Sequence, residues 1–403
     1  MEDIYSNSFL NIAGTSRFTQ SDGLFSIREC HSDPWPGTTL VQSHHITADL
    51  DGSSRRVFAR YNLESGHRYF SQEASNGKHI APLLERAWVF QERLLAPRTL
   101  HFYTSKLIWE CRSTLRCECQ ELDAISHWQA AQRTLHNQLS RKHHPTSSKT
   151  LFGEICQSGA PLQAVLDFWL EAVLSYSTLS LTFEKDRAVA LAGIAQRIGN
   201  FVRSPYLAGL WAADLPRSLL WYRFGAKEYK FSRSLKIAPS WSWASSSAKT
   251  SFSCAAHYLP VLHNGFVKDE RVEINYSGIL HDTPRENPFA TFTRNYLEIT
   301  APFLIVIINQ DYNLDLGSRE VLDRTSWDYD WAIGGPDQIL PGEKAYCLLV
   351  GRATTVEHLQ YCLILRPAGD QLGCYKRIGS ISIGREMLSG LFDHAEIITV
   401  KVI

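Results

Sequence analysis

The residues whose types and spacing could do chemistry are Cys111, Cys117 and Cys119, followed by His127. Thiolate and imidazole groups are the ligands of structural zinc sites, which usually hold four of them at CxxC-like spacing. Here five residues separate Cys111 from Cys117, and only one separates Cys117 from Cys119, so neither interval fits that pattern. Nine cysteines in a long chain without a secretory signal favour reduced thiols instead, so we expect no metal site.

Motifs for other common chemistries are missing from the sequence. The run Gly334-Gly335-Pro336 lacks the Lys-Ser/Thr pair that completes a phosphate-binding P-loop. No G-x-S-x-G segment occurs, and Ser, His and Asp residues are too scattered to nominate a catalytic triad. The sequence therefore makes no independent case for hydrolysis or phosphoryl transfer.

Two pairs of tryptophans invite a ligand-stacking hypothesis. Trp241 and Trp243 could stack on a carbohydrate, but two indoles on one face of a strand are better explained as filling a joint between domains. Trp327 and Trp331 could line an apolar pocket for a small ligand in the C-terminal region. That pocket remains an open alternative.

Composition and charge exclude several classes of protein. Lys plus Arg and Asp plus Glu number 41 each, so no net field draws the chain to nucleic acid or to an anionic membrane. The basic run 141–149 is expected to be an exposed loop. The N-terminus has no apolar signal core, and the longest strongly apolar run, 303–308, is far shorter than the roughly 20 residues of a spanning helix. We expect a cytoplasmic protein without a membrane span.

The stretch 83–111 has the clearest secondary-structure pattern in the sequence, a helix followed by a hairpin. The runs 99–103 and 107–111 are rich in aromatic and β-branched residues and predict a hairpin. Before them, Pro97 would end a helix. That helix would bury apolar residues at i, i+4, i+7 and i+11 spacing, namely Leu83, Ala87, Phe90 and Leu94.

The rest of the chain divides by its hydrophobic periodicity. Amphipathic patterns predict helices over 128–139, 161–177 and 186–198, the last with Asp186 as its N-cap. The indoles of 239–243 alternate as in a strand. After residue 251 the texture becomes β-rich and predicts an antiparallel sandwich or open barrel, with strands at 271–276, 296–308, 345–351, 360–366, 375–383 and 395–402.

The central stretch contains a specific motif, made up of Arg86, Trp88, Gln91, Glu92, Arg93, Trp109 and Cys111. It resembles the heterokaryon incompatibility (HET) domain of filamentous fungi, and the segments 4–16, 186–195, 206–211 and 239–245 resemble the regions around that domain in the same order. The resemblance covers about the first 245 residues. The residues of the family motif are Arg86, Trp88, Gln91, Glu92, Arg93, Trp109, Cys111, Trp241 and Trp243.

The resemblance implies an α+β protein in three parts. Residues 1–120 would be the C-terminal part of an α/β, TIR-like HET domain, because two strands that normally open the domain do not occur in the sequence. Residues 121–250 would be a helical region that ends in the Trp241/Trp243 strand. Residues 251–403 would be a β-rich C-terminal domain. We therefore expect an N-terminally truncated HET domain.

The resemblance also implies a function. The family triggers non-self recognition and programmed cell death. We therefore expect an interaction or regulatory module, or a degenerate copy of one, that binds protein partners or other copies of itself. We expect it to need no cofactor. The alternative is enzymatic, because some TIR domains cleave NAD⁺ with a helix-borne glutamate. Glu92 is the candidate for that role, where a carboxylate would stabilise positive charge developing on the ribose. The sequence offers this one glutamate and not a complete catalytic site, so the non-enzymatic function is favoured.

Overall fold

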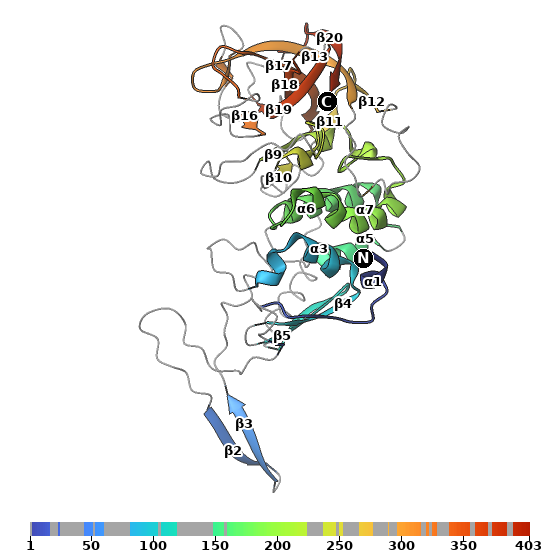
Figure 1. Ribbon diagram of the computed structural model, residues 1–403, viewed down its shortest axis with the longest axis vertical. Coiled ribbons are helices and arrows are strands. Elements are labelled where there is room, and N and C mark those ends of the chain that lie inside the picture. The colour runs from blue at the N-terminus through green and yellow to red at the C-terminus, as the bar shows by residue number, and fades with distance from the viewer. Residues whose placement is uncertain are drawn as a thin grey trace.

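The structure of the protein is a computed structural model. Figure 1 shows a β-barrel at one end, the helices α6 and α7 in the middle, and a small sheet with α3 below them. The β2–β3 hairpin projects away from this body. The described residues are 2–16, 23–24, 44–50, 53–59, 81–103, 106–118, 148–156, 159–223, 237–246, 250–252, 266–276, 289, 296–315, 320–321, 325–328, 338–354, 359–369, 373–384 and 390–403.

A four-stranded sheet in the order β1-β4-β5-β6 forms the N-terminal part. β1 runs parallel to β4, and the other neighbours are antiparallel. The predicted hairpin is confirmed, with Thr99 opposite Glu110. The elements of this part are α1 (Glu2–Ser6), β1 (Asn11–Ala13), β4 (Arg98–Phe102), β5 (Leu107–Cys111), β6 (Leu115–Cys117) and the separate hairpin β2 (His44–Leu50) and β3 (Ser53–Ala59).

The central helix begins later than its periodicity predicts. Residues Pro82–Glu85 form a 3₁₀ turn, Arg86 is extended, and α3 spans Ala87–Leu95. The predicted start at Leu83 was wrong, because a backbone bridge pulls Arg86 out of helical geometry. The amide of Ala87 donates to the Ser180 carbonyl (3.0 Å), and the amide of Ser180 donates to the Glu85 carbonyl (2.7 Å).

Three further helices pack on α3 and on one another. The predicted helix at 161–177 is confirmed as α6, whereas α7 begins three residues after Asp186, so Asp186 is not its N-cap. The chain from 184 to 187 instead forms a 3₁₀ turn. The predicted helix at 128–139 lies outside the described residues. These helices are α5 (Ser148–Ile155), α6 (Leu162–Ser177) and α7 (Val189–Val202).

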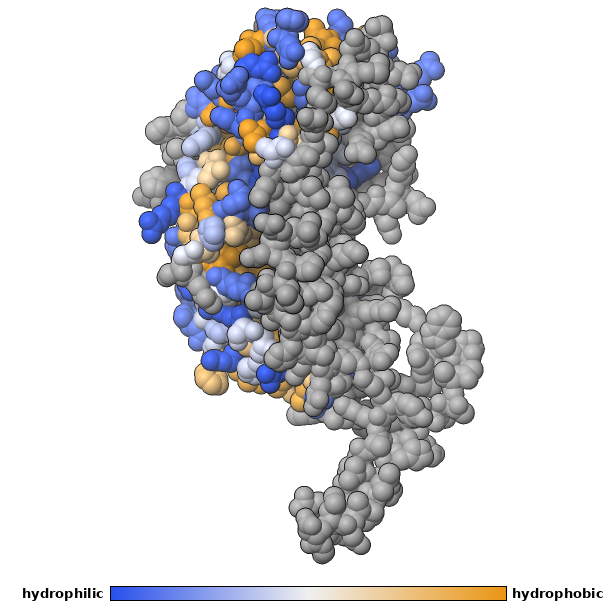
Figure 2. Space-filling model, turned by 180° about the vertical axis from the view of Figure 1, so that it is seen from behind, coloured by the Kyte–Doolittle hydropathy of each residue, from blue (hydrophilic) through white to orange (hydrophobic). Residues whose placement is uncertain are grey.

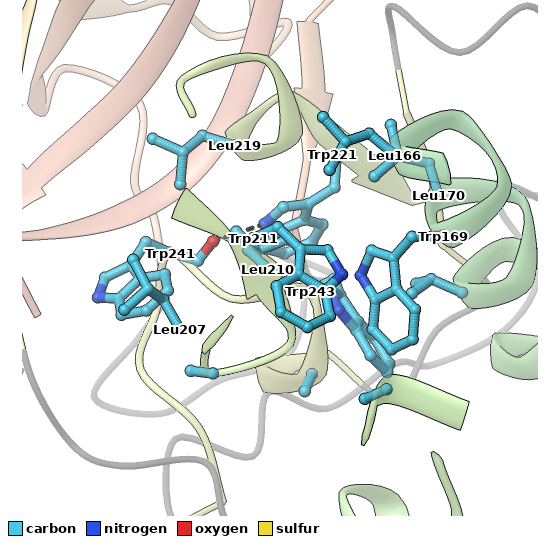
Figure 3. Close-up of a cluster of buried hydrophobic side chains, with 14 of the residues drawn as sticks. Leu166, Trp169, Leu170, Leu207, Leu210, Trp211, Leu219, Trp221, Trp241 and Trp243 are labelled. Atoms are coloured by element: carbon cyan, nitrogen blue, oxygen red, sulfur yellow. Dashed lines mark hydrogen bonds between the residues drawn. The ribbon is translucent and has the colours of Figure 1, made fainter. Parts of the chain in front are cut away.

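Five tryptophans are fully buried next to α6 and α7 (Figure 3). The indole nitrogens of Trp169 and Trp243 both donate to the Gly209 carbonyl, each at 3.0 Å. The predicted strand at 239–243 was wrong. The Ser242 hydroxyl accepts from the amide of Ala244 and so caps a 3₁₀ turn, Trp243–Ser245. The short elements nearby are β7 (Tyr206–Leu207), β8 (Leu210–Trp211), β9 (Trp221–Arg223) and β10 (Thr250–Phe252).

The C-terminal strands close into a barrel. The pairings β13–β17–β18–β19–β20 return to β13, and only the short β19–β20 contact is parallel. The predicted β-rich runs correspond to these strands. Their bounds are β11 (Phe266–Lys268), β12 (Glu273–Asn275), β13 (Leu297–Ile308), β14 (Leu314–Asp315), β15 (Glu320–Val321), β16 (Thr325–Trp327), β17 (Lys344–Ala353), β18 (Gln360–Pro367), β19 (Cys374–Ile383) and β20 (Glu396–Val402).

The long strand β13 belongs to two cores. Its first half buries Leu297, Ile299 and Ala301 in a large core that also contains α3, α6 and α7. Its second half buries Val306 and Ile308 in a smaller cluster on the other face. One hydrophobic core therefore runs across position 250, where the sequence predicts a domain boundary.

No helix within the described ranges is both long and apolar enough to cross a membrane. Figure 2 shows hydrophobic residues interspersed with hydrophilic ones over the coloured part of one face.

Candidate functional site

The motif residues on α3 attach this helix to its neighbours. Gln91 is 3% exposed, and its Oε1 accepts a hydrogen bond from the amide of Gly193 on α7 (2.7 Å). A Cβ at Gly193 would lie 2.9 Å from that oxygen, so the close approach of the two helices requires glycine here. The indole of Trp88 donates to Asp186 over a longer distance, 3.4 Å. These motif side chains hold the helix in place.

Glu92, the predicted catalytic residue, is half-buried on α3 beside α1. Its side chain forms a hydrogen bond with Tyr5, and burial together with this carboxylate raises the pKa of Tyr5 to about 12. Glu92 does not line the pocket formed by Tyr176, Leu181 and their neighbours. Its role in catalysis stays a prediction.

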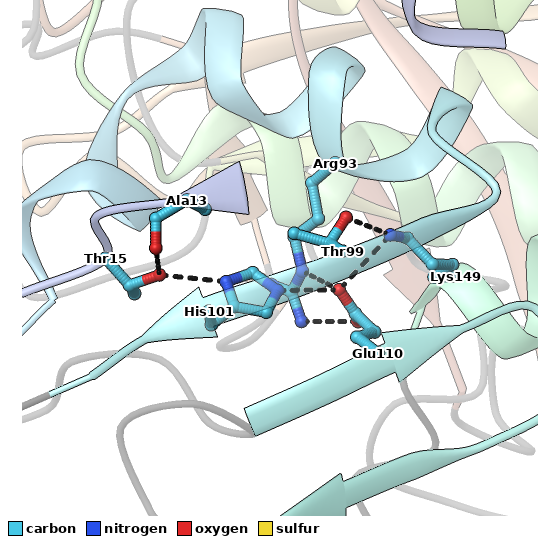
Figure 4. Close-up of polar contacts among 7 residues, drawn as sticks. All are labelled: Ala13, Thr15, Arg93, Thr99, His101, Glu110 and Lys149. Carbon is cyan, nitrogen blue, oxygen red and sulfur yellow. Dashed lines mark hydrogen bonds and ion pairs between the residues drawn. The ribbon is translucent and has the colours of Figure 1, made fainter. Parts of the chain in front are cut away.

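The strongest concentration of charge lies under α3, where four elements meet (Figure 4). Glu110 on β5 is fully buried and accepts two hydrogen bonds from Arg93, each 2.8 Å long. The same carboxylate lies 3.3 Å from Nε2 of His101 and 3.6 Å from Nζ of Lys149. Lys149 also donates to the Thr99 hydroxyl (2.6 Å). We call these residues, together with Thr15, the Glu110 cluster.

Electrostatics fix the charge states within the cluster. Burial alone would raise the pKa of Glu110, but Arg93 and Lys149 hold it well below its ordinary value, so the carboxylate is ionised. Burial lowers the pKa of His101 despite the neighbouring carboxylate. Burial also lowers the pKa of Lys149, to about 8. At neutral pH the cluster has two cations for one anion and a neutral imidazole.

The neutral imidazole has one assignable tautomer. Ionised Glu110 only accepts hydrogen bonds, so Nε2 of His101 donates to it and Nδ1 accepts from the Thr15 hydroxyl (2.8 Å). A hydroxyl, an imidazole and a carboxylate in this order form the relay of a nucleophilic triad. However, Thr15, His101 and Glu110 are at most 1% exposed, so no substrate reaches the hydroxyl. The arrangement acts as an ionic lock between the four elements α3, β4, β5 and α5, and Thr15 joins it from the turn after β1.

The low pKa of Lys149 predicts a pH dependence of stability. Between its folded value of about 8 and its ordinary value of 10.5, the unfolded chain binds more protons, so this group's contribution to stability rises with pH. Below pH 8 the full penalty of burying the charge remains. We expect Lys149→Met to lose this rise, as measured by urea unfolding of both proteins from pH 7 to 10.

Thr99→Val is the matched control for this experiment. It removes the hydrogen bond from Lys149 but keeps the amine, so its stability should rise with pH as in the unmodified protein. A Lys149→Met profile that parallels the unmodified protein would show that this amine does not titrate as described.

The other predicted site residues are not part of the Glu110 cluster. Those that the structure describes in this region lie in the strands β5 and β6. Trp109 is half-buried on the opposite face of β5 from Glu110. Cys111 is on that opposite face too, whereas Cys117 faces the interior beside Ile108, so the two thiols do not converge. Cys119 and His127 lie outside the described residues. Within the described ranges, no group of three or more His, Cys, Asp or Glu residues is suited to a metal ion.

The tryptophan pairs have a structural role where they are described. Trp241 and Trp243 are at most 1% exposed and pack in the large core, as expected for side chains that fill a joint. Trp327 is partly buried against the smaller core, and Trp331 lies outside the described residues. No stacking platform is formed by the described members of either pair.

The sequence did not predict the Glu110 cluster, although one signal was present. In β5 the residues alternate between the two faces, and Glu110 occupies an inward position two residues after buried Ile108. A carboxylate at such a position requires a buried cation. Comparison with family models, with characterised proteins and with solved structures found no match to the chain.

Proposed function

We propose that this chain is a heterokaryon-incompatibility-type protein of non-self recognition and programmed cell death. The observation that supports this proposal is the packing of the segments that resemble the family. Gln91 contacts Gly193, Trp88 contacts Asp186, and Trp243 contacts Gly209, although these segments are far apart in the sequence. Residues that share a family pattern and also share one core are expected to be inherited as one unit.

The proposed mode of action is docking of a protein partner or a second copy in the cytoplasm. In the Glu110 cluster, all residues except Arg93 are buried away from solvent. By contrast, the segment 4–12, which runs from α1 to β1, exposes three large apolar side chains: Ile4 (71%), Phe9 (81%) and Ile12 (54%). Exposed apolar groups gathered on one short segment favour an interaction surface. A TIR-like NAD⁺ cleavage at Glu92 is the alternative.

Inducible expression in a filamentous fungus tests the two modes, with cell death and cellular NAD⁺ as readouts. We expect the unmodified chain to cause death without loss of NAD⁺. Phe9→Ser combined with Ile12→Ser should abolish death, because both side chains are exposed and their loss leaves the core intact. Glu92→Gln should cause as much death as the unmodified chain.

Tyr5→Phe is the control for Glu92→Gln, because it breaks the same hydrogen bond but leaves the carboxylate. If Glu92→Gln abolishes both death and NAD⁺ loss while Tyr5→Phe does not, the enzymatic alternative replaces the docking proposal. If the unmodified chain causes no death, the proposed function itself is contradicted.

A further inference from the structure

A separate pocket of about 180 Å³ opens between the end of α6 and the turn that precedes α7. It is lined by Tyr176, Ser177, Leu179, Leu181, Glu184 and Arg187. Most of its polar groups already have partners. The Tyr176 hydroxyl donates to the Arg187 carbonyl (2.9 Å) and the Ser177 hydroxyl accepts from the amide of Thr250 (2.8 Å). The exception is the guanidinium of Arg187.

Arg187 is a buried charge without a matching anion. The residue is 8% exposed, and its Nη1 donates to the Ser246 carbonyl (2.5 Å). Its Nε is buried and makes no hydrogen bond, and none of the ion pairs within the described residues includes Arg187. Other buried arginines of this chain have carboxylate partners, as Arg377 has Asp328 and Arg217 has Asp214.

A guanidinium in this position costs free energy unless an anion accompanies it, because a buried charge loses its hydration. The charge of Glu184 opposes the fall in the pKa of Arg187 that burial causes, but its side chain is exposed and forms no described ion pair with Arg187, so it compensates the buried charge only in part. A volume of about 180 Å³ is large enough for a phosphate or carboxylate group. Oxyanions match the planar N–H donors of arginine better than spherical ions do.

We propose that this pocket binds one small oxyanion, a phosphate or carboxylate group, which supplies the counter-charge of Arg187. Arg187 lines the pocket, and since its Nε is sealed and its Nη1 bonds to Ser246, its Nη2 donates to the oxyanion. Leu179 and Leu181 line the pocket beside it and strengthen this attraction by excluding water. Glu184 is a lining residue of the same charge as the ligand, so it weakens binding. This site goes beyond the proposed function and does not depend on it.

Thermal unfolding in inorganic phosphate and in acetate, each against chloride at equal ionic strength, tests the site on the whole chain. A ligand that binds only the folded state raises the unfolding midpoint with its concentration. We expect both oxyanions to raise it and chloride to leave it unchanged. A larger effect of phosphate would favour a phosphate group as the ligand, and a larger effect of acetate would favour a carboxylate. Because phosphate also stabilises folded proteins by exclusion from their surface, only the part of the shift that Glu184→Gln increases is counted.

Substitutions on either side of the pocket should shift the affinity in opposite directions. Arg187→Met should weaken oxyanion binding about tenfold or more, the value of a lost charged hydrogen bond. Glu184→Gln should strengthen it several-fold, and because Glu184 is exposed this variant will fold. Glu273→Gln on β12, an identical exposed change outside the pocket, is the matched control and should change nothing.

Two results would overturn the proposal. One is an unfolding midpoint that responds equally to chloride, phosphate and acetate, which would mean that water alone fills the pocket. The other is a Glu184→Gln variant whose oxyanion affinity equals that of Glu273→Gln. The second comparison holds even if Arg187→Met fails to fold through loss of its contact with Ser246.

Discussion

Glu110→Gln should lower the free energy of unfolding by about 3–5 kcal/mol, the usual cost of breaking a buried ion pair on one side. The amide keeps the shape of the side chain but not its charge. Lys149 then remains fully buried beside Arg93 with no anion between them. Urea unfolding followed by far-ultraviolet circular dichroism measures the loss.

Glu118→Gln is the matched control, because Glu118 is exposed just after β6 and a glutamine there can still accept the hydrogen bond from the amide of Leu107. This change should cost less than about 1 kcal/mol. Combining Glu110→Gln with Lys149→Met should recover part of the loss, since the second change removes a buried cation whose ion pair with Glu110 is gone. A Glu110→Gln variant as stable as Glu118→Gln would show that the cluster does not act as an ionic lock.

Arg377→Met should destabilise the chain by a similar amount, about 3–5 kcal/mol. Arg377 on β19 is fully buried, and its Nη1 donates to Asp328 (2.6 Å). Its Nη2 donates to the carbonyl of Trp221, and its guanidinium lies 3.7 Å from the ring centroid of Trp221. One side chain thus connects the barrel to the helical part, and its loss removes the ion pair with buried Asp328.

A double-mutant cycle separates the ion pair from the packing of the side chain. Asp328→Asn alone should also destabilise the protein, but the combination with Arg377→Met should cost clearly less than the sum of the two. Chemical unfolding of the four proteins provides the measurement. Additive effects would mean that Arg377 stabilises the junction through its contact with Trp221 alone.

The elements that the sequence predicts well are those whose pattern is local. Strands β13, β17, β18 and β19 follow from β-branched runs between Gly, Pro and Asp, and α6 follows from a polar stripe every four residues. The errors arise where a distant contact overrides the local pattern. Ser180 breaks the helix at Arg86, and the serines between the tryptophans cap a turn although their alternation mimics a strand.

The site was harder to predict for the same reason. Arg93, His101 and Glu110 are close in sequence, but Lys149 arrives from α5 and Thr15 from the end of β1. No spacing rule joins residues over such separations. Gln91 and Arg93 stand out in the motif, yet only the structure shows that they hold helix and sheet together, whereas Glu92 beside them contacts Tyr5.

The closure of the barrel affects how the chain is made. β13 pairs with β20, so the pairing of Leu297 with Val402 forms only after the ribosome has added about one hundred further residues. Contacts between such distant residues form slowly, because the intervening loop must first lose its entropy. Since residues of β13, β17, β18 and β20 belong to the same core as α3, α6 and α7, that core also remains incomplete until synthesis has nearly ended. The five buried tryptophans, at positions 169 to 243, therefore stay exposed until the last strand has been made, and the yield in cells will depend on chaperones that shield them.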